Sequence, residues 1–296
     1  MIRFAAIILA VFAVSMSVNT FAQALPPTDL WLVQIDQGVP VTPVKISTND
    51  GYNNQPHFSA DGLFIYYTHE IPIDDGTAQT DIAAFNTKTS TTTMVNRTPQ
   101  SEYSPTPIPG REAVSVIQVE TDQKQRLWAI DVPTGKMELL FANMEPVGYH
   151  AWVNDHEVAM FILGDTFTLQ TARLDNTETK VIARNIGRSI RKHPLSNEVL
   201  FVDKNHEPWQ IAAFNPDTTS VTKVMPLFPN GEDFTIDEQG HYWTGNGSKL
   251  YMRSVNDTRW QLMADFKAFG IRNITRLAVN LNSNQITLVS DLVVAD

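Results

Sequence analysis

The chain has 296 residues, of which 43% are hydrophobic, and its formal net charge is −10. That hydrophobic fraction is sufficient for a folded core and argues against a disordered chain. The acidic balance disfavours a nucleic-acid-binding protein, whose surface must attract phosphates, and it disfavours adhesion to anionic lipid. The sequence has no cysteine, which excludes disulfides, thiolate metal sites and thiol catalysis.

The first 24 residues have the pattern of a secretory signal peptide. A basic start at Arg3 is followed by an apolar run over residues 4–18 and by a polar stretch that ends in Ala22-Gln23-Ala24. The apolar run is too short to span a bilayer, so we expect cleavage near Ala24; an uncleaved anchor is the alternative. No cysteine follows the run, so we expect no lipoprotein. The remaining 272 residues, with net charge −11, are expected to form a periplasmic protein without membrane insertion.

A polar turn followed by an alternating apolar strand recurs six times along the rest of the chain. The turns are marked by Gly62, Gly110, His156, Asn197, Gly240 and Asn284. Successive markers stand 48, 46, 41, 43 and 44 residues apart. Repeat periods of about 40 to 50 residues are typical of propeller blades.

Each repeat also contains further strands. A second element ends in a polar turn such as Pro-Thr-Gly or Asn-Asp-Thr, and it lies at residues 81–90, 126–135, 168–177, 210–219 and 249–258. A third element follows it, at 91–97, 136–142, 179–185, 221–227 and 259–265. A weaker fourth strand, such as residues 53–59, precedes each marker turn. Four short strands per repeat predict antiparallel blades.

The sixth repeat lacks its last two strands, and the missing strands match the N-terminal region at residues 28–37 and 42–48. The sequence therefore predicts an all-β, six-bladed β-propeller of four-stranded antiparallel blades, in which the N-terminal strands complete the last blade. Such closure removes exposed sheet edges. A two-sheet sandwich does not explain the divided repeat. The predicted propeller is a single domain over residues 25–296, with blades at about 53–101, 102–145, 146–186, 187–230, 231–266 and 267–296 closed by 25–50.

The first repeat resembles the TolB-like repeat, a WD40-like pattern also called PD40. The resemblance rests on Asn53, Pro56, Phe58, Ser59, Asp61 and Gly62, followed by Ile65 and Tyr67. Ala60 stands where the repeat usually has proline. The resemblance implies a six-bladed propeller of a kind that usually binds proteins. In the namesake an N-terminal α/β domain precedes the propeller, and it works with envelope proteins of Gram-negative bacteria. Here only about 30 residues precede the first full blade, so we expect a propeller-only relative.

The sequence contains none of the common catalytic or nucleotide-binding motifs. It has no G-x-S-x-G, no G-x-x-x-x-G-K, no G-x-G-x-x-G and no H-E-x-x-H pattern. We therefore predict no catalytic residue, no cofactor and no metal site.

The candidate binding surface is the channel mouth where the innermost strands begin, because loops and strand starts there form the usual binding surface of a propeller. Arginine and tyrosine, which protein interfaces favour, occur among its residues, and Arg188, Arg191 and Arg272 could together hold a carboxylate. Ordinary ion pairs of these arginines with Glu232 and Asp233 are the alternative. The predicted set is Tyr52, Asn53, Asn54, Glu102, Tyr103, Tyr149, His150, Arg188, Arg191, Glu232, Asp233, Arg272 and Asn273.

Two functions from different classes fit this pattern. The first is a non-catalytic binding or scaffold module, expected to be a monomer, that recognises a protein or peptide partner in the cell envelope. The second is a metal-dependent lactonase or hydrolase with a divalent cation in the channel, for which Glu102, Asn54 and Asp233 could supply ligands. Three arginines at the same level would repel a cation, so we favour binding.

Overall fold

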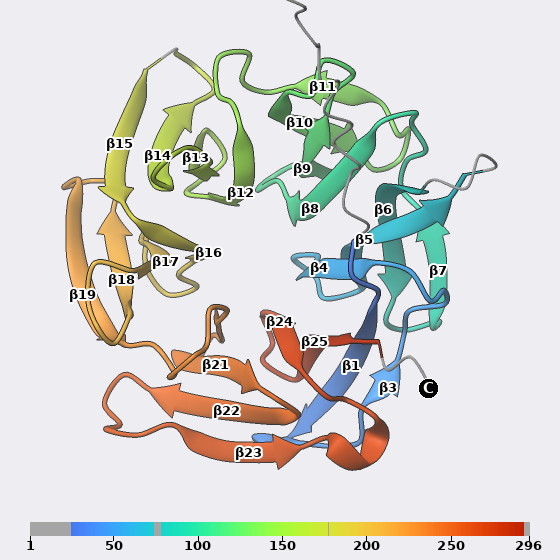
Figure 1. The fold of residues 1–296 in the computed structure, drawn as a ribbon, viewed down its shortest axis with the longest axis vertical. Coiled ribbons are helices and arrows are strands. Elements are labelled where there is room, and N and C mark those ends of the chain that lie inside the picture. The colour runs from blue at the N-terminus through green and yellow to red at the C-terminus, as the bar shows by residue number, and fades with distance from the viewer. Residues whose placement is uncertain (1–24, 74–77, 177, 293–296) are drawn as a thin grey trace, which may run out of the picture.

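The computed structural model describes residues 25–73, 78–176 and 178–292. Six antiparallel sheets surround a central axis, and in Figure 1 the strands that begin the blades lie nearest this axis. The prediction of a six-bladed propeller is confirmed. The predicted signal peptide, residues 1–24, lies outside the described residues.

The first five blades each use four strands in chain order. Blade one contains β4 (Asn53–Phe58), β5 (Phe64–Pro72), β6 (Ala78–Asn86) and β7 (Thr91–Met94). Blade two contains β8 (Ser101–Pro107), β9 (Ala113–Val119), β10 (Gln125–Asp131) and β11 (Met137–Leu139). Blade three contains β12 (Val147–Trp152), β13 (Glu157–Ile162), β14 (Thr168–Arg173) and β15 (Thr179–Arg184). Blade four contains β16 (Ile186–Lys192), β17 (Val199–Asp203), β18 (Gln210–Asn215) and β19 (Ser220–Pro226). Blade five contains β20 (Thr235–Ile236), β21 (His241–Asn246), β22 (Lys249–Ser254) and β23 (Gln261–Asp265).

Blade six is built from both ends of the chain. Its inner strands are β24 (Ile274–Val279) and β25 (Gln285–Asp291), and its outer strands are β1 (Thr28–Asp36) and β3 (Val44–Lys45). β1 pairs antiparallel with β25 from Thr28 opposite Asp291 to Gln34 opposite Gln285. This pairing confirms that the N-terminal strands close the ring. A short hairpin strand, β2 (Val39–Pro40), also pairs with β1, and a 3-10 helix, η1 (Lys267–Phe269), precedes β24.

The turn of the first repeat shows why the marker residues recur. The Asp61 carboxylate accepts hydrogen bonds from the Ser59 hydroxyl at 2.6 Å and from the Leu63 backbone N–H at 3.0 Å. Gly62 has a φ of +72°, a conformation that glycine adopts without steric cost. Gly110 and Gly240 have φ values of +73° and +79° at the matching turns of blades two and five. These residues are therefore turn-forming residues between the first two strands of a blade.

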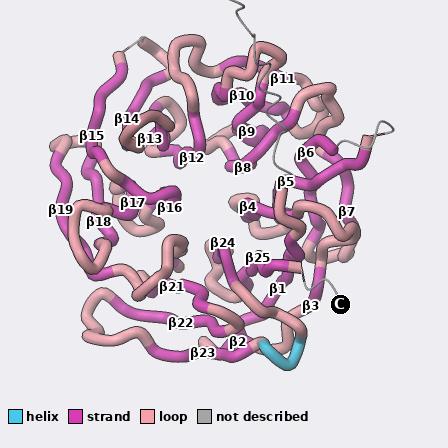
Figure 2. Tube along the Cα trace, viewed as in Figure 1, coloured by secondary structure: helices cyan, strands magenta, loops and turns pink. Residues whose placement is uncertain are grey.

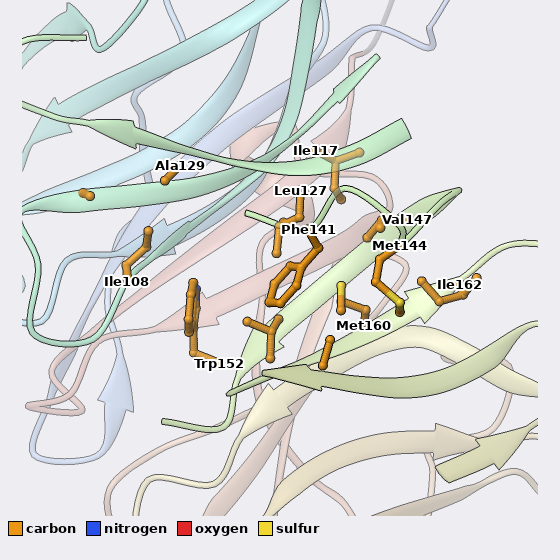
Figure 3. Packing of buried hydrophobic residues seen from close by; sticks show 13 residues of the cluster. Ile108, Ile117, Leu127, Ala129, Phe141, Met144, Val147, Trp152, Met160 and Ile162 are labelled. Carbon is orange, nitrogen blue, oxygen red and sulfur yellow. The ribbon is translucent and has the colours of Figure 1, made fainter. Parts of the chain in front are cut away.

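The core lies between neighbouring blades, because alternate side chains of each strand face opposite neighbours. In β1, Leu30 and Leu32 pack in the cluster between blades six and one. Val33 and Ile35 pack in the cluster with Trp243 of blade five. Figure 3 shows the corresponding cluster between blades two and three, where Phe141 and Trp152 are surrounded by aliphatic side chains. The buried β1 side chains thus attach the last blade to both of its neighbours.

Blade five departs from the other blades at its inner edge. Its first strand, β20, has only two residues, whereas the other five inner strands have six or seven. Figure 2 shows loop where this edge approaches the centre. The loop contains Glu232 and Asp233, so the irregular blade contributes two acidic side chains near the axis.

Candidate functional site

A small chamber of about 40 Å³ lies on the axis, and we call it the channel chamber. Residues from the inner region of all six blades line it, so it is the point where the blades converge. The lining residues are Gln55, Pro56, His57, Ser104, Pro105, Thr106, Tyr149, His150, Arg188, Ser189, Ile190, Arg191, Asp233, Arg276 and Leu277.

Breaks in strand pairing place several of these residues around the chamber. The register shifts between Asn54 and His57 in β4, between Tyr103 and Thr106 in β8, and between Ile186 and Ile190 in β16. A bulge of this kind bends the strand and changes the direction of its side chains. The residues inside these three shifts that line the chamber are Gln55, Pro56, Ser104, Pro105, Arg188 and Ser189.

Arg191 connects three blades. Its guanidinium donates hydrogen bonds to the Phe234 carbonyl at 3.1 Å and to the Leu277 carbonyl at 3.2 Å. It also forms an ion pair with Asp233 at 3.0 Å, and the Asp233 side chain is only 6% exposed. Burial, with smaller contributions from Arg276 and Arg188, lowers the pKa of Arg191. Arg191 therefore stabilises the junction of blades four, five and six.

Arg276 is a chamber residue that the sequence interpretation missed. Its Nε donates to the Asn54 side-chain oxygen at 2.8 Å, and its Nη2 donates to the Tyr149 hydroxyl at 2.9 Å. A third contact, at 3.7 Å, joins it to Asp233. The sequence interpretation instead placed Arg272 and Asn273 at the mouth, because it put the start of the inner strand too early. β24 begins only at Ile274.

The structure places Arg272 and Asn273 differently from the chamber residues. Arg272 is exposed and lies beside Lys249 and Tyr251 in an outer depression. Asn273 donates a hydrogen bond to the Asp291 carboxylate at 2.9 Å.

Arg188 has the fewest protein partners of the three chamber arginines. Its Nη2 donates to the Thr275 carbonyl at 3.1 Å, and its Nε lies 3.9 Å from the Glu232 carboxylate. Among the described residues, this Nε has no hydrogen-bond partner although it is buried. Glu232 is already bound to Lys204 at 2.7 Å. Since a guanidinium has five N–H donors, Arg188 keeps most of its capacity to bind an anion.

The channel chamber is positively charged within an acidic protein. Its lining contains three arginines and one carboxylate, which gives a net charge of +2 when the histidines are neutral. Burial lowers the pKa of His57 and of His150 to about 3, so both are neutral near pH 7. His150 shares a short 2.6 Å hydrogen bond with Ser115, which fixes its ring against blade two.

The predicted residues of blade one are buried in the structure. Asn53 is fully buried, and its amide donates to the backbone carbonyls of Thr28, Asn49 and Gly51. It thereby attaches β4 to the start of β1. Tyr52 is also buried, and burial raises its pKa to about 12. Asn54 reaches the chamber indirectly, through its contact with Arg276.

Glu102 and Tyr103 do not line the channel chamber. Glu102 is fully buried and accepts hydrogen bonds from Asn96 at 2.8 Å, Thr98 at 2.6 Å and Gln118 at 2.8 Å. Burial outweighs these contacts and raises the pKa of Glu102 to about 7. Tyr103 packs against the core between blades two and three. Of the thirteen predicted residues, the structure brings Tyr149, His150, Arg188, Arg191 and Asp233 together around the chamber.

A polar cleft of about 230 Å³ adjoins the channel chamber on its blade-five side. We call it the blade-five cleft. It shares Arg188, Asp233 and Leu277 with the chamber, so the two spaces are contiguous. Its other lining residues are Asn230, Gly231, Glu232, Gly245, Asn246, Gly247, Asn273, Ile274 and Thr275.

Comparison with solved structures identifies the fold. A protein assigned as a TolB of Agrobacterium tumefaciens superposes with a TM-score of 0.69 at 10% sequence identity, over 91% of this chain and 100% of that chain. The TolB of Acinetobacter baumannii superposes with a TM-score of 0.55 at 10% identity, over 90% of this chain and 64% of that longer chain. The chain is a TolB-like six-bladed β-propeller in its fold. No family model and no curated protein matches the sequence.

The same architecture also occurs in an enzyme. An oligogalacturonate lyase from Vibrio parahaemolyticus superposes on this TolB-like propeller with a TM-score of 0.56 at 13% identity, over 84% of this chain and 80% of that chain. At these identities the likeness concerns the fold, and function must be argued from the site.

The described part of this TolB-like propeller contains no group of three or more His, Cys, Asp or Glu side chains with the geometry of a metal site. The three residues considered for a cation are each engaged elsewhere: Asn54 with Arg276, Glu102 with Gln118, and Asp233 with Arg191. Within the same described ranges, no helix has the length and apolar character needed to cross a bilayer.

Proposed function

We propose that this chain is an exported, non-catalytic TolB-like propeller that recognises a protein or peptide partner through the mouth of its channel. The observation that carries the proposal is the arginine cluster of the channel chamber, which has a net charge of +2 within a chain of net charge −10. Taking arginines out of water is costly unless opposite charge accompanies them. A partner that supplies a carboxylate would offset that cost.

In this proposal Arg188 makes the principal contact with the partner. It lies where the chamber and the blade-five cleft meet, and its side chain is 30% exposed. Tyr149 and Arg276 would form the opposite wall, held by their 2.9 Å hydrogen bond. Glu232 and Asn273 line the cleft and would contact the partner outside the chamber.

The proposed location is the periplasm, and the proposed partner is a component of the cell envelope. The N-terminal basic, apolar and Ala-x-Ala pattern supports export. The likeness to two TolB structures supports a binding role for the fold. We further propose that the protein acts as a monomer.

Envelope crosslinking with a charge-reversed arginine tests the proposal. Arg188→Glu should abolish crosslinking to the partner, because it places a second carboxylate beside Glu232 where the partner's anion would bind. The matched control is Arg184→Glu on the exposed outer strand β15. Thermal unfolding should be nearly unchanged in both variants. A crosslinked partner that survives Arg188→Glu would contradict the proposal.

A channel enzyme is the second candidate, and one observation favours it. The fold is shared with an oligogalacturonate lyase, and the cationic chamber would also suit the carboxylate of a uronic acid. A metal-dependent lactonase or hydrolase belongs to the same class of candidate. Incubation with oligogalacturonate and with simple lactones, with and without added divalent cations, tests both reactions. Turnover that is lost in Arg276→Gln would support an enzyme, and absence of turnover would argue against these substrates.

A further inference from the structure

The blade-five cleft occupies a position that β-sheet pairing fills in the other blades. In blade one, Asn54 at the start of β4 pairs with Thr68 in the middle of β5. In blade two, Glu102 of β8 pairs with Gln118 of β9 in the same way. In blade five, the pairing of β20 with β21 stops at Thr235 opposite Trp243. Residues 230–233 and residues 245–247 face each other across the cleft instead of pairing.

Among the described residues, this arrangement leaves the inner edge of β21 unpaired at Gly245, while the Gly247 carbonyl accepts a hydrogen bond from the Ile274 N–H at 2.8 Å. The His241 carbonyl accepts a hydrogen bond from Asp237, and Trp243 pairs with Thr235. Every second residue of a strand directs its backbone N–H and C=O to the same edge. Gly245 follows His241 and Trp243 in steps of two residues, so its N–H and C=O also point to the inner edge. An unpaired edge is able to pair with an extended segment of another chain.

Gly245 packs directly against blade six at this edge. A Cβ atom at this position would lie 2.3 Å from the Ile274 side chain, so close packing of blade six against β21 requires glycine here. Gly245 also lines the cleft, so a ligand there can approach its backbone from the side away from Ile274.

The chamber at the end of the cleft is suited to a small anionic group. A cavity needs roughly 10–15 Å³ to hold one water molecule, so the 40 Å³ chamber has room for a carboxylate but not for a large side chain. Arg188 lies at the junction with its Nε unpartnered among the described residues. The nearby carboxylates of Glu232 and Asp233 are compensated by Lys204 and Arg191.

We propose that the blade-five cleft binds the C-terminal end of an extended polypeptide. The terminal carboxylate would bind Arg188, and the preceding main chain would pair with the free edge of β21 at Gly245. A C-terminus satisfies both features because its carboxylate is attached directly to the main chain, whereas an Asp or Glu side chain would separate the carboxylate from the pairing backbone. This inference rests on the proposed partner-binding function and specifies the part of the partner that is recognised.

Paired peptide arrays test the inference. Short peptides of varied sequence are immobilised by their N-termini, once with a free C-terminal carboxylate and once as the matching C-terminal amide. Purified wild-type propeller is applied to both arrays, and affinities of the strongest sequences are measured in solution. The variants are Arg188→Gln, which removes the carboxylate partner, and Asn246→Trp, which fills the cleft without changing its charge. Arg184→Gln is the matched control, and thermal unfolding confirms that each variant is folded.

We expect the wild-type propeller to bind free-acid peptides and to bind the matching amides about tenfold or more weakly. Arg188→Gln and Asn246→Trp should weaken binding of the free acids by a similar factor, and Arg184→Gln should not change it. Equal binding of acids and amides would overturn the C-terminal inference while leaving partner recognition at the channel mouth intact. Absence of peptide binding would also overturn it. The envelope crosslinking of Arg188→Glu then decides the proposed function separately, because that experiment needs no C-terminal ligand.

Discussion

Two arginines three residues apart in β16 have different roles. Arg191 donates to carbonyls of blades five and six and pairs with the buried Asp233, whereas Arg188 donates one hydrogen bond, to Thr275. The same residue type thus serves to hold the blades together in one case and remains available to a ligand in the other. The difference follows from the register shift between Ile186 and Ile190, which contains Arg188 but not Arg191.

We predict that Arg191→Gln destabilises the fold by roughly 3 kcal/mol, the scale for breaking a buried ion pair, because it leaves Asp233 with only its longer 3.7 Å contact to Arg276 as an ion pair. Arg188→Gln should change stability by less than about 1 kcal/mol. Urea unfolding of the two variants measures both values. Equal stabilities would contradict the distinction between the two arginines.

Glu102 should make stability depend on pH. Its pKa is raised by burial from 4.5 to about 7, so the folded state holds a proton that the unfolded state has lost between these two pH values. Stability therefore falls as pH rises from 4.5 through 7, by roughly 3 kcal/mol at about 1.4 kcal/mol per pKa unit. Glu102→Gln cannot ionise, so the difference in unfolding free energy between wild type and variant should change by this amount between pH 4.5 and 8. A constant difference would show that Glu102 is ionised in the folded protein.

At the scale of the element, blade five has an inner strand of only two residues, and its next strand, β21, packs against Ile274 of blade six through Gly245. We predict that Gly245→Ala destabilises the propeller by about 1–3 kcal/mol, the usual cost of overpacking, since its Cβ would overlap the Ile274 side chain. Asn246→Ala, one residue further along the same strand, is the control and should have little effect. Thermal unfolding of the two variants measures the effect, and an unchanged midpoint for Gly245→Ala would show that blade six moves away from β21 easily.

The repeat period predicted the blades, whereas the site depended on details of pairing that the period does not contain. Turn residues such as Asp61-Gly62 and alternating apolar strands are local signals, so six blades and the N-terminal closure were predictable. The register shift that precedes Arg276 depends on contacts between strands, and the sequence interpretation therefore selected Arg272, four residues too early. The sequence contains one weak indication that β20 is short: Asn230-Gly231 precedes it, and this dipeptide favours a turn.

At the scale of the whole molecule, the pairing of β1 with β25 closes the ring. Seven paired positions with β25 join β1 to the rest of blade six, and its buried aliphatic side chains pack against blades one and five. This junction joins the two ends of the chain, so we expect the stability of the ring to depend on it.

A disulfide across the closure tests this dependence. Gln34→Cys with Gln285→Cys places a pair of thiols at opposed positions of β1 and β25 in a chain that has no other cysteine. We expect the oxidised protein to unfold at a higher temperature than the reduced protein, because the bond constrains a long loop in the unfolded state. The reduced double variant should match wild type. If oxidation leaves the unfolding midpoint unchanged, ring closure does not limit stability.

The central claim is that a partner binds at the channel mouth on the blade-five side, and site-specific photocrosslinking tests it most directly. A small aliphatic photoreactive residue at Asn246, too short to fill the cleft as tryptophan would, lies in the blade-five cleft, whereas one at Arg111 lies at an exposed turn after β8, at the opposite end of the inner strands. In native envelopes, we predict partner crosslinks from position 246 that disappear when Arg188→Glu is added, and none from position 111. Crosslinks from position 111 alone, or crosslinks from position 246 that persist with Arg188→Glu, would contradict the claim.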